Sequence, residues 1–240
     1  MSEERERRND FGKIRVTQRD LIGMDWVATM GTVRLDALAQ LFSILEGREI
    51  SLEATRKVVQ RWVVAGWAIQ QSILKGEAPY VWLTKDGMAQ TRFRLPTDPP
   101  ALSLLIHTSD LSFIRLEVLR SNPFAYWRSE REIRQVASSH TKGNNFPHIP
   151  DAEVIIGEDR IIAIERERTA KTIERTRNIM LALCSRKFDY SVPENLPDKD
   201  QQFRYSEIFY YANKESIGVV DKAKNQLPEN FNKRVRVITW

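Results

Sequence analysis

Three carboxylates and a lysine lie close together in one stretch of this sequence. Asp151 follows Pro150, Glu165 and Glu167 stand two positions apart, and Lys171 comes four positions later. Hard divalent cations such as Mg²⁺ take oxygen ligands, and they are usually bound through one or two carboxylates together with phosphate oxygens. A nearby ammonium group can orient a water molecule or neutralise phosphate charge. The stretch could therefore hold Mg²⁺ or Mn²⁺, with Asp151, Glu165 and Glu167 as ligands.

The apolar residues around these carboxylates predict two strands. Runs rich in β-branched residues at 154–156 and 161–164 flank Gly157-Glu158-Asp159, which is typical of a hairpin. Because side chains alternate along a strand, Glu165 and Glu167 are expected on one face. A helical pattern follows over 172–184, with Lys171 at its start.

The same charges also have a purely structural explanation. Glu165 and Glu167 alternate with Arg166 and Arg168, so cross-strand ion pairs could account for them. Asp151, which comes directly after a proline, could serve only to order a turn. The sequence leaves both interpretations open.

The remaining elements of the second half indicate an α/β arrangement. Trp127-Arg128-Ser129-Glu130 is expected to begin a helix with Ser129 as N-cap, and Glu132 completes a capping box. Glu130 has no such role and is a further candidate for the site. A strand is predicted at 207–212, a helix at 214–227 and a last strand at 235–240. This order favours a mixed sheet.

The first half reads as helices followed by a hairpin. Thr17 opens the first helix, and Ser51 is a suitable N-cap for the third. Two short strands, 67–69 and 80–83, are joined by a polar turn, and a further helix is expected from Thr84 through Phe93.

This pattern resembles a winged helix-turn-helix domain over residues 14–95. The segments that carry the resemblance are Gly66-Trp67-Ala68-Ile69 and Leu83-Thr84-Lys85-Asp86-Gly87. In such domains a recognition helix enters the major groove of DNA and the wing touches the backbone. Transferred to this chain, the recognition helix is Leu52–Ala65. The DNA-contacting residues would be Arg56, Lys57, Gln60, Arg61 and, on the wing, Lys75. The alternative is a winged helix for protein contact, in which these charges merely solvate a surface.

A proline-rich segment, 95–100, separates the two halves and predicts a domain boundary. Residues 101–122 are expected to form an amphipathic helix that either links the domains or pairs with a second copy in a homodimer. His107 lies on this helix. A lone histidine on such a helix is usually a packing or interface residue.

The second half, 127–240, resembles the PD-(D/E)XK nuclease superfamily. The resemblance rests on Pro150-Asp151, Glu165-Arg166-Glu167 and Lys171. It implies that Asp151 and Glu165 bind Mg²⁺. Glu167 stands where the usual motif has a lysine, and Lys171 could supply the missing ammonium.

Two other parts of the superfamily pattern are sought in the segment before Asp151. Glu130 could match the acidic residue often found on the first helix of the superfamily. The first strand of the usual core is not evident, because 138–147 is polar.

Taken as a whole, the chain resembles the replication-relaxation family of mobile-element proteins. This resemblance rests first on the winged-helix pattern and the linking helix. It rests also on four short motifs: Trp-x-Ser-Glu-Arg-Glu-Ile-Arg from Trp127, His-x-Pro-Asp from His148, Ile164-Glu-x-Glu, and Lys171. The resemblance implies a two-domain α+β or α/β protein, with an N-terminal winged helix and a C-terminal nuclease-like domain with a mixed sheet. It also implies a DNA-binding protein of plasmid or phage origin.

Composition sets broad limits on these hypotheses. The chain has 240 residues, of which 42% are hydrophobic, enough for one large or two ordinary domains. Its net charge of +5 and pI of about 9.3 come from interspersed charges, which is compatible with nucleic acid without being specific to it. No apolar run approaches the roughly 18 residues of a membrane span. The single cysteine, Cys184, favours a reducing compartment, so we expect a cytoplasmic protein with no membrane contact.

Three functions are compatible with this sequence. The first is a duplex-DNA-binding regulator of transcription or replication. The second is a Mg²⁺-dependent endonuclease or nickase that the winged helix directs to its site. The third is an adaptor that binds only proteins.

Overall fold

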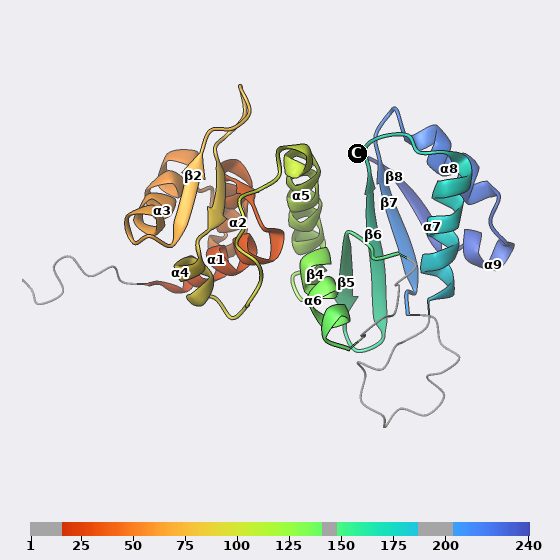
Figure 1. The fold of residues 1–240 in the computed structure, drawn as a ribbon, viewed down its shortest axis with the longest axis horizontal. Helices are drawn as coiled ribbons and strands as arrows, with labels where there is room; N and C mark the ends of the chain where they lie inside the picture. The colour runs from red at the N-terminus through yellow and green to blue at the C-terminus, as the bar shows by residue number, and fades with distance from the viewer. Residues whose placement is uncertain (1–15, 141–147, 187–203) are drawn as a thin grey trace, which may run out of the picture. The chain divides into compact units, whose positions relative to one another are not determined.

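The computed structural model describes residues 16–140, 148–186 and 204–240 (Figure 1). The chain forms two compact units, Met1–Pro99 and Pro100–Trp240. The division lies within the proline-rich segment that the sequence marks as a boundary. Among the described residues, no helix has both the length and the apolar character needed to cross a membrane.

The N-terminal unit combines helices with a small antiparallel sheet. Its elements are α1 (Gln18–Met30), β1 (Val33–Arg34), α2 (Leu35–Glu46), α3 (Leu52–Val64), β2 (Ala68–Gln71), β3 (Tyr80–Leu83) and α4 (Lys85–Ala89). The strand order is β1-β3-β2. The two-residue strand β1 has no clear signal in the sequence. Helix α4 ends at Ala89, earlier than the predicted Phe93, so that expectation is wrong.

Side-chain caps fix where these helices begin. The Thr17 side chain accepts from the Asp20 backbone N–H, and Asp20 in turn accepts from the Thr17 backbone, which completes a capping box. The Ser51 hydroxyl accepts from the Ala54 N–H at 3.1 Å at the start of α3. Both caps are confirmed. They satisfy backbone donors that the first turn of a helix leaves without intrahelical partners.

The two segments that suggest a winged helix meet in space. The Thr84 N–H donates to the Trp67 carbonyl at 3.0 Å, and the Thr84 hydroxyl donates to the Gly66 carbonyl at 2.6 Å. Gly87 lies so close to Trp67 that a Cβ atom at position 87 would stand 1.8 Å from the Trp67 carbonyl oxygen. The absence of a side chain at Gly87 therefore permits this contact.

The C-terminal unit is built on a five-stranded mixed sheet. Its elements are η1 (Leu102–Leu104), α5 (Leu105–Ser121), β4 (Tyr126–Ser129), α6 (Glu130–His140), β5 (Ala152–Ile156), β6 (Arg160–Glu167), α7 (Ile173–Ser185), β7 (Glu207–Ala212), α8 (Ile217–Asn225), α9 (Glu229–Asn232) and β8 (Val235–Thr239). The strand order is β4-β5-β6-β7-β8. The β4–β5 and β5–β6 pairs are antiparallel, and the β6–β7 and β7–β8 pairs are parallel. The expected α+β class with a mixed sheet is confirmed.

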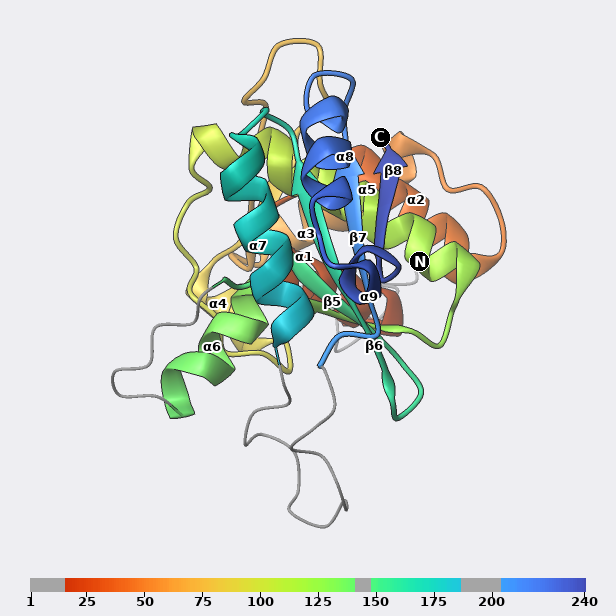
Figure 2. The same cartoon turned by 90° about the vertical axis from the view of Figure 1, so that its right-hand side faces the viewer.

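Helices cover both faces of this sheet. Helix α5 lies on one face and α7 and α8 lie on the other, as Figures 1 and 2 show from two directions. The face toward α7 and α8 carries an apolar cluster, in which Cys184 is fully buried. Other members of the cluster are Ala163, Met180, Leu183, Tyr205, Ile208, Tyr210, Val220 and Val235.

The predicted N-cap at Ser129 is confirmed, but the residues before it form a strand that was not predicted. Tyr126–Ser129 forms strand β4, and helix α6 begins only at Glu130. The capping box itself is present, because the Glu132 carboxylate accepts from the Ser129 backbone N–H at 2.9 Å. Strand β4 supplies a strand ahead of the hairpin, and it lies before 138–147, the polar segment in which no strand is evident from the sequence. Residues 138–140 belong to α6, and 141–147 lie outside the described residues.

Candidate functional site

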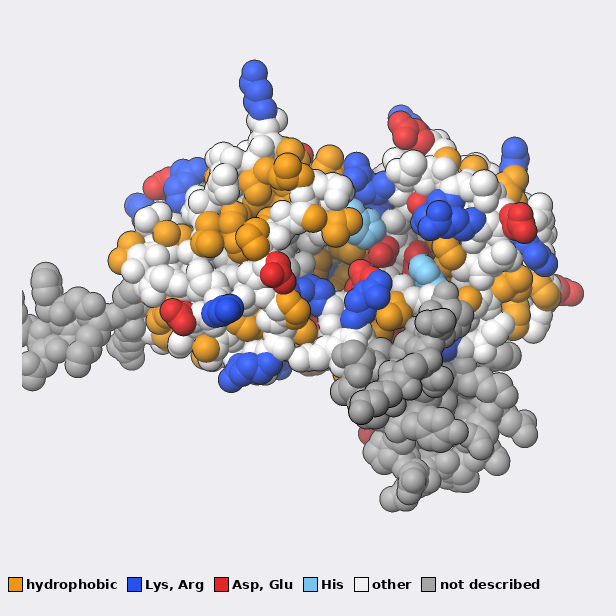
Figure 3. Space-filling model, in the orientation of Figure 1, with side chains coloured by type: hydrophobic (Ala, Val, Ile, Leu, Met, Phe, Trp, Pro, Cys, Tyr) orange, Lys and Arg blue, Asp and Glu red, His pale blue; other side chains and the backbone are white. Residues whose placement is uncertain are grey.

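The candidate carboxylates lie at one end of the β5–β6 pair. The antiparallel register pairs Ala152 with Ile164, which sets Asp151 at the start of β5 beside the end of β6. Glu165 and Glu167 are only 6% and 5% exposed. Figure 3 shows acidic side chains next to pale-blue imidazoles, with basic side chains around them. The structure thus brings together residues that the sequence separates by fourteen positions or more.

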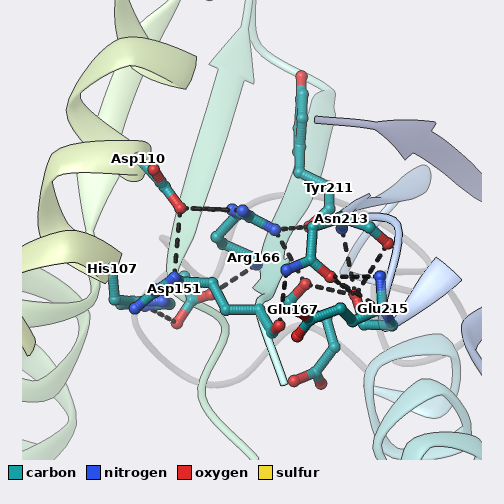
Figure 4. A network of polar contacts seen from close by, with 10 residues as sticks. His107, Asp110, Asp151, Arg166, Glu167, Tyr211, Asn213 and Glu215 are labelled. Atoms are coloured by element: carbon teal, nitrogen blue, oxygen red, sulfur yellow. Dashed lines mark hydrogen bonds and ion pairs between the residues drawn. The ribbon is translucent and has the colours of Figure 1, made fainter. Parts of the chain in front are cut away.

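Two contacts hold both oxygens of Asp151. The Arg166 backbone N–H donates to Asp151 Oδ2 at 2.7 Å, and His107 Nε2 shares a hydrogen bond with Asp151 Oδ1 at 3.2 Å. His107 comes from α5, and Figure 4 shows it pointing toward Asp151. The Asp151 carboxylate therefore joins α5 to β6, which is more than the ordering of a local turn.

Glu165 is a buried carboxyl group with an unusual charge environment. Its Oε1 lies 2.8 Å from His148 Nε2. Burial, followed by the negative charge of Asp151, raises the pKa of Glu165 to about 7. His148 and Lys171 act in the opposite direction, but their effect is smaller. Neighbouring carboxylates that disfavour each other's ionisation are a common feature of functional sites.

Both histidines of the site have pKa values above that of an ordinary histidine. Burial lowers the pKa of His107, but the hydrogen bond to Asp151 and its charge more than reverse this. Burial likewise lowers the pKa of His148, and the hydrogen bond to Glu165 outweighs it. Each imidazole therefore binds a proton more readily than an ordinary histidine does. From the sequence, His107 was expected only as a packing or interface residue, and His148 had no separate role.

Glu167 and Lys171 form an ion pair at the end of β6. The Ser216 hydroxyl donates to the backbone carbonyl of Glu167 at 2.7 Å, and this contact fixes the end of the strand. Lys171 is therefore held beside Glu167, and its charge also reaches Glu165.

Arg166 forms a second link between α5 and the sheet. Its Nε donates to Asp110 Oδ2 at 2.9 Å, and its Nη1 donates to the backbone carbonyls of Glu167 at 2.9 Å and Tyr211 at 3.0 Å (Figure 4). Arg168 also approaches Asp110, at 3.6 Å. Both arginines thus reach Asp110 on α5. Among the contacts described, neither forms a cross-strand pair with Glu165 or Glu167, whose partners are His148 and Lys171 instead.

Glu130 lies at the margin of the site. Its backbone N–H donates to the Asp151 carbonyl at 3.0 Å, which continues the β4–β5 pairing. Its carboxylate pairs with Arg134 one helical turn later. The charge of Glu130 nevertheless contributes to the raised pKa of His107. The structure therefore places Glu130 near the other candidates, although its side chain has a partner of its own.

The candidate DNA-contacting residues of the N-terminal unit differ in exposure and in the contacts that they make within the protein. Arg56, Lys57 and Gln60 are exposed on α3, and Arg56 pairs with Glu53 at 2.8 Å. Arg61 instead donates to the buried carboxylate of Asp20 at 2.7 Å, so it helps to fasten α3 to α1. Lys75 is exposed in the connection between β2 and β3.

In 16–140, 148–186 and 204–240, no group of three or more His, Cys, Asp or Glu side chains is arranged so that it could hold a metal ion. Comparisons of the chain with protein-family models, curated proteins and solved structures find no match.

Proposed function

We propose that this chain is a DNA-binding protein whose N-terminal unit binds duplex DNA and regulates transcription or replication. The observation that carries this proposal is the order α1-β1-α2-α3-β2-β3 with the sheet order β1-β3-β2. The succession of three helices, the β2–β3 hairpin and the closing helix α4 supports the winged-helix resemblance, and β1 adds a third strand to the hairpin. In that arrangement α3 is the recognition helix, and its exposed Arg56, Lys57 and Gln60 would meet base edges and phosphates.

Charge placement, rather than total charge, would drive this binding. Residues 16–99 contain ten Lys and Arg and nine Asp and Glu, so the unit is close to neutral. Arg19, Arg34 and Arg92 are paired with acidic side chains. Lys57 on α3 and Lys75 on the wing are exposed cations that could contact phosphates. The resemblance to the replication-relaxation family adds a plasmid or phage setting to the proposal, and the helix expected over residues 101–122 adds a homodimer.

A gel-shift series tests this proposal. Duplex fragments from the genetic neighbourhood of the chain are titrated with the protein at low salt, and the shifted fragment is then titrated at rising salt. We expect a shift that weakens steeply as salt rises, because phosphate contacts release counterions. If no fragment shifts at low salt, the proposal is wrong. Sedimentation of the free protein and of the complex tests the dimer.

The second candidate function is cation-dependent cleavage of a phosphodiester backbone. The environment of Glu165 favours it. Two neighbouring carboxylates, one buried and with a pKa raised to about 7, have an electrostatic reason to take a cation. Their oxygens are the donors that Mg²⁺ and Mn²⁺ accept, and two protein carboxylates are enough when waters and phosphate oxygens complete the shell. The oxygens of these two carboxylates are therefore chemically suited to such a cation, although the described His, Asp and Glu side chains do not form a group of three or more around one cation position.

In this second function Asp151 and Glu165 would hold the cation, with Glu167 beside them. A bound divalent cation would lower the pKa of a water molecule and stabilise charge on the phosphate. Lys171 would orient the substrate through its positive charge. His107 and Arg166 would keep the Asp151 carboxylate in place through the two hydrogen bonds that they make to it.

Calorimetric titration with Mn²⁺ and a plasmid-nicking assay test the second function. The variants are Asp151→Ala and Glu165→Ala, and Glu158→Ala in the exposed hairpin turn is the control. We expect Mn²⁺ binding and nicking in the wild type and the control, and loss of both in the two site variants. Nicking that survives both site changes would come from another source and would refute this function.

A further inference from the structure

The hydroxyl of Tyr210 is buried and makes no hydrogen bond within the part of the chain that the structure describes. Tyr210 is 1% exposed, and its hydroxyl oxygen has no partner there. The hydroxyl of Tyr205, which is also buried, donates to Glu153 at 2.8 Å. A buried hydroxyl without a partner costs free energy, so it calls for a specific explanation such as a bound water or ion.

The position of Tyr210 on the sheet points to the carboxylate site. Strand β7 pairs in parallel with β6, and Tyr210 is the register partner of Glu165. Side chains of register partners lie on the same face of a sheet. Glu167, two residues further along β6, lies on that face as well. The orphan hydroxyl and the carboxylates therefore belong to neighbouring strands and share one side of the sheet.

The electrostatic surroundings of Tyr210 agree with this placement. Burial, followed by the negative charges of Glu165, Glu167 and Asp151, raises the pKa of Tyr210 well above its usual range. The phenol therefore keeps its proton and acts as a hydrogen-bond donor. Since it makes no direct bond to a carboxylate oxygen, a water molecule is the natural bridge between them.

We propose that Tyr210 is a further residue of the carboxylate site, where its hydroxyl donates a hydrogen bond to a water molecule on a divalent cation held by Asp151 and Glu165. This inference rests on the second proposed function, the cation site. Cations such as Mg²⁺ keep several waters when they bind proteins, and those waters need acceptors and donors around them. Tyr210 would therefore be a positioning residue that acts through the water.

The test removes the hydroxyl alone. Tyr210→Phe is compared with wild type in a calorimetric titration with Mn²⁺ and in thermal unfolding without metal. Tyr211→Phe is the matched control, because it is the same chemical change one residue later on β7, on the opposite face of the sheet. We expect the Tyr210 variant to bind Mn²⁺ about ten-fold or more weakly, as is typical for the loss of a contact around the ligands. We expect its thermal midpoint without metal to be equal to that of wild type or higher, because it loses an unsatisfied group.

The outcomes separate this inference from the function on which it rests. If the wild type and both tyrosine variants bind Mn²⁺ equally, the cation site stands and the role of Tyr210 is refuted. If the wild type binds no Mn²⁺, the cation site and the inference both fail. A lower thermal midpoint of Tyr210→Phe without metal would show that the hydroxyl has a structural partner, and this would also overturn the inference.

Discussion

At Glu165, burial and the charge of Asp151 oppose ionisation, while His148 and Lys171 favour it. The net result is a pKa of about 7, compared with 4.5 for an unperturbed glutamate. A carboxyl group with a raised pKa stabilises the fold fully only below its unfolded-state pKa. That contribution is lost as pH rises through the folded-state value. The raised pKa values of His107 and His148 also make stability fall as pH rises, because the folded protein binds a proton at each histidine more tightly than the unfolded chain does.

We therefore predict that Glu165→Gln flattens the dependence of stability on pH. Between pH 5 and pH 8 the metal-free wild type should lose about 3 kcal/mol more than the variant, the free energy that corresponds to the shift at Glu165. Urea unfolding of both proteins at the two pH values measures this. Glu174→Gln on the exposed surface of α7 should keep the wild-type slope. If the unfolding free energy of wild type and of Glu165→Gln changed equally between the two pH values, Glu165 would not be the source of the pH dependence.

Asp110 is the counter-charge of the buried Arg166. Asp110→Asn should lower the free energy of unfolding by about 3 kcal/mol, because it leaves a buried guanidinium without its carboxylate. Chemical denaturation of the variant measures the loss. Glu117→Gln, an exposed change on the same helix, is expected to stay within about 0.5 kcal/mol of wild type. A loss of that small size in Asp110→Asn would mean that α5 is held by other contacts.

Only part of the site could be predicted from the residues themselves. Asp151, Glu165, Glu167 and Lys171 stand within one stretch, and the hairpin pattern indicates that they come together. His107 contacts Asp151, 44 positions away, and Asp110 contacts Arg166, 56 positions away. Nothing in the sequence around His107 or Asp110 indicates these partners. His148 is part of the same stretch and could have been included, because it lies three residues before Asp151.

At the scale of the elements, the contact between the start of β2 and helix α4 depends on a single glycine. A side chain at Gly87 would collide with the backbone carbonyl of Trp67, and a rigid backbone atom cannot move aside as a flexible side chain can. This contact holds the two ends of the β2–β3 hairpin region together.

Gly87→Ala is therefore expected to destabilise the N-terminal unit strongly, by about 3 kcal/mol or more. Gly218→Ala in α8 is the matched control, since a Cβ atom there meets no atom within 4 Å. Because alanine is a better helix former, the control should gain about 0.5–1 kcal/mol. Thermal unfolding of both variants tests the pair. A Gly87→Ala protein as stable as wild type would show that α4 does not need this contact.

Element types were more predictable than element limits. Strands β5, β6 and β7 follow from their β-branched and aromatic runs, and Thr17, Ser51 and Thr84 mark helix starts. Strand β4 was missed because Tyr126–Ser129 is short and partly polar and leads directly into a capping box. Its strand character comes from pairing with β5, which local sequence does not reveal.

For the whole molecule, the two units carry different chemistry. The N-terminal unit presents α3 and the exposed connection between β2 and β3, and the C-terminal unit contains the carboxylate site. The sequence alone indicates the division into two units, because the proline-rich segment 95–100 interrupts the helical pattern. The Mn²⁺ and nicking assays test whether the carboxylate site cleaves DNA. DNA binding is the more general claim, because the regulator and the nuclease hypotheses both require it.

The measurement that tests this claim most directly is the anisotropy of a fluorescent duplex titrated with the protein over a series of salt concentrations. The proteins are wild type, the double variant Lys57→Ala, Gln60→Ala on α3, and Lys85→Ala on α4 as the control. We expect wild type and control to bind alike, with affinity falling linearly on logarithmic axes as salt rises. The double variant should bind about ten-fold more weakly, with a salt slope smaller by about one. Wild-type protein that leaves the duplex unbound at low salt, or a double variant that binds like wild type, would contradict the assignment of α3 as the recognition helix.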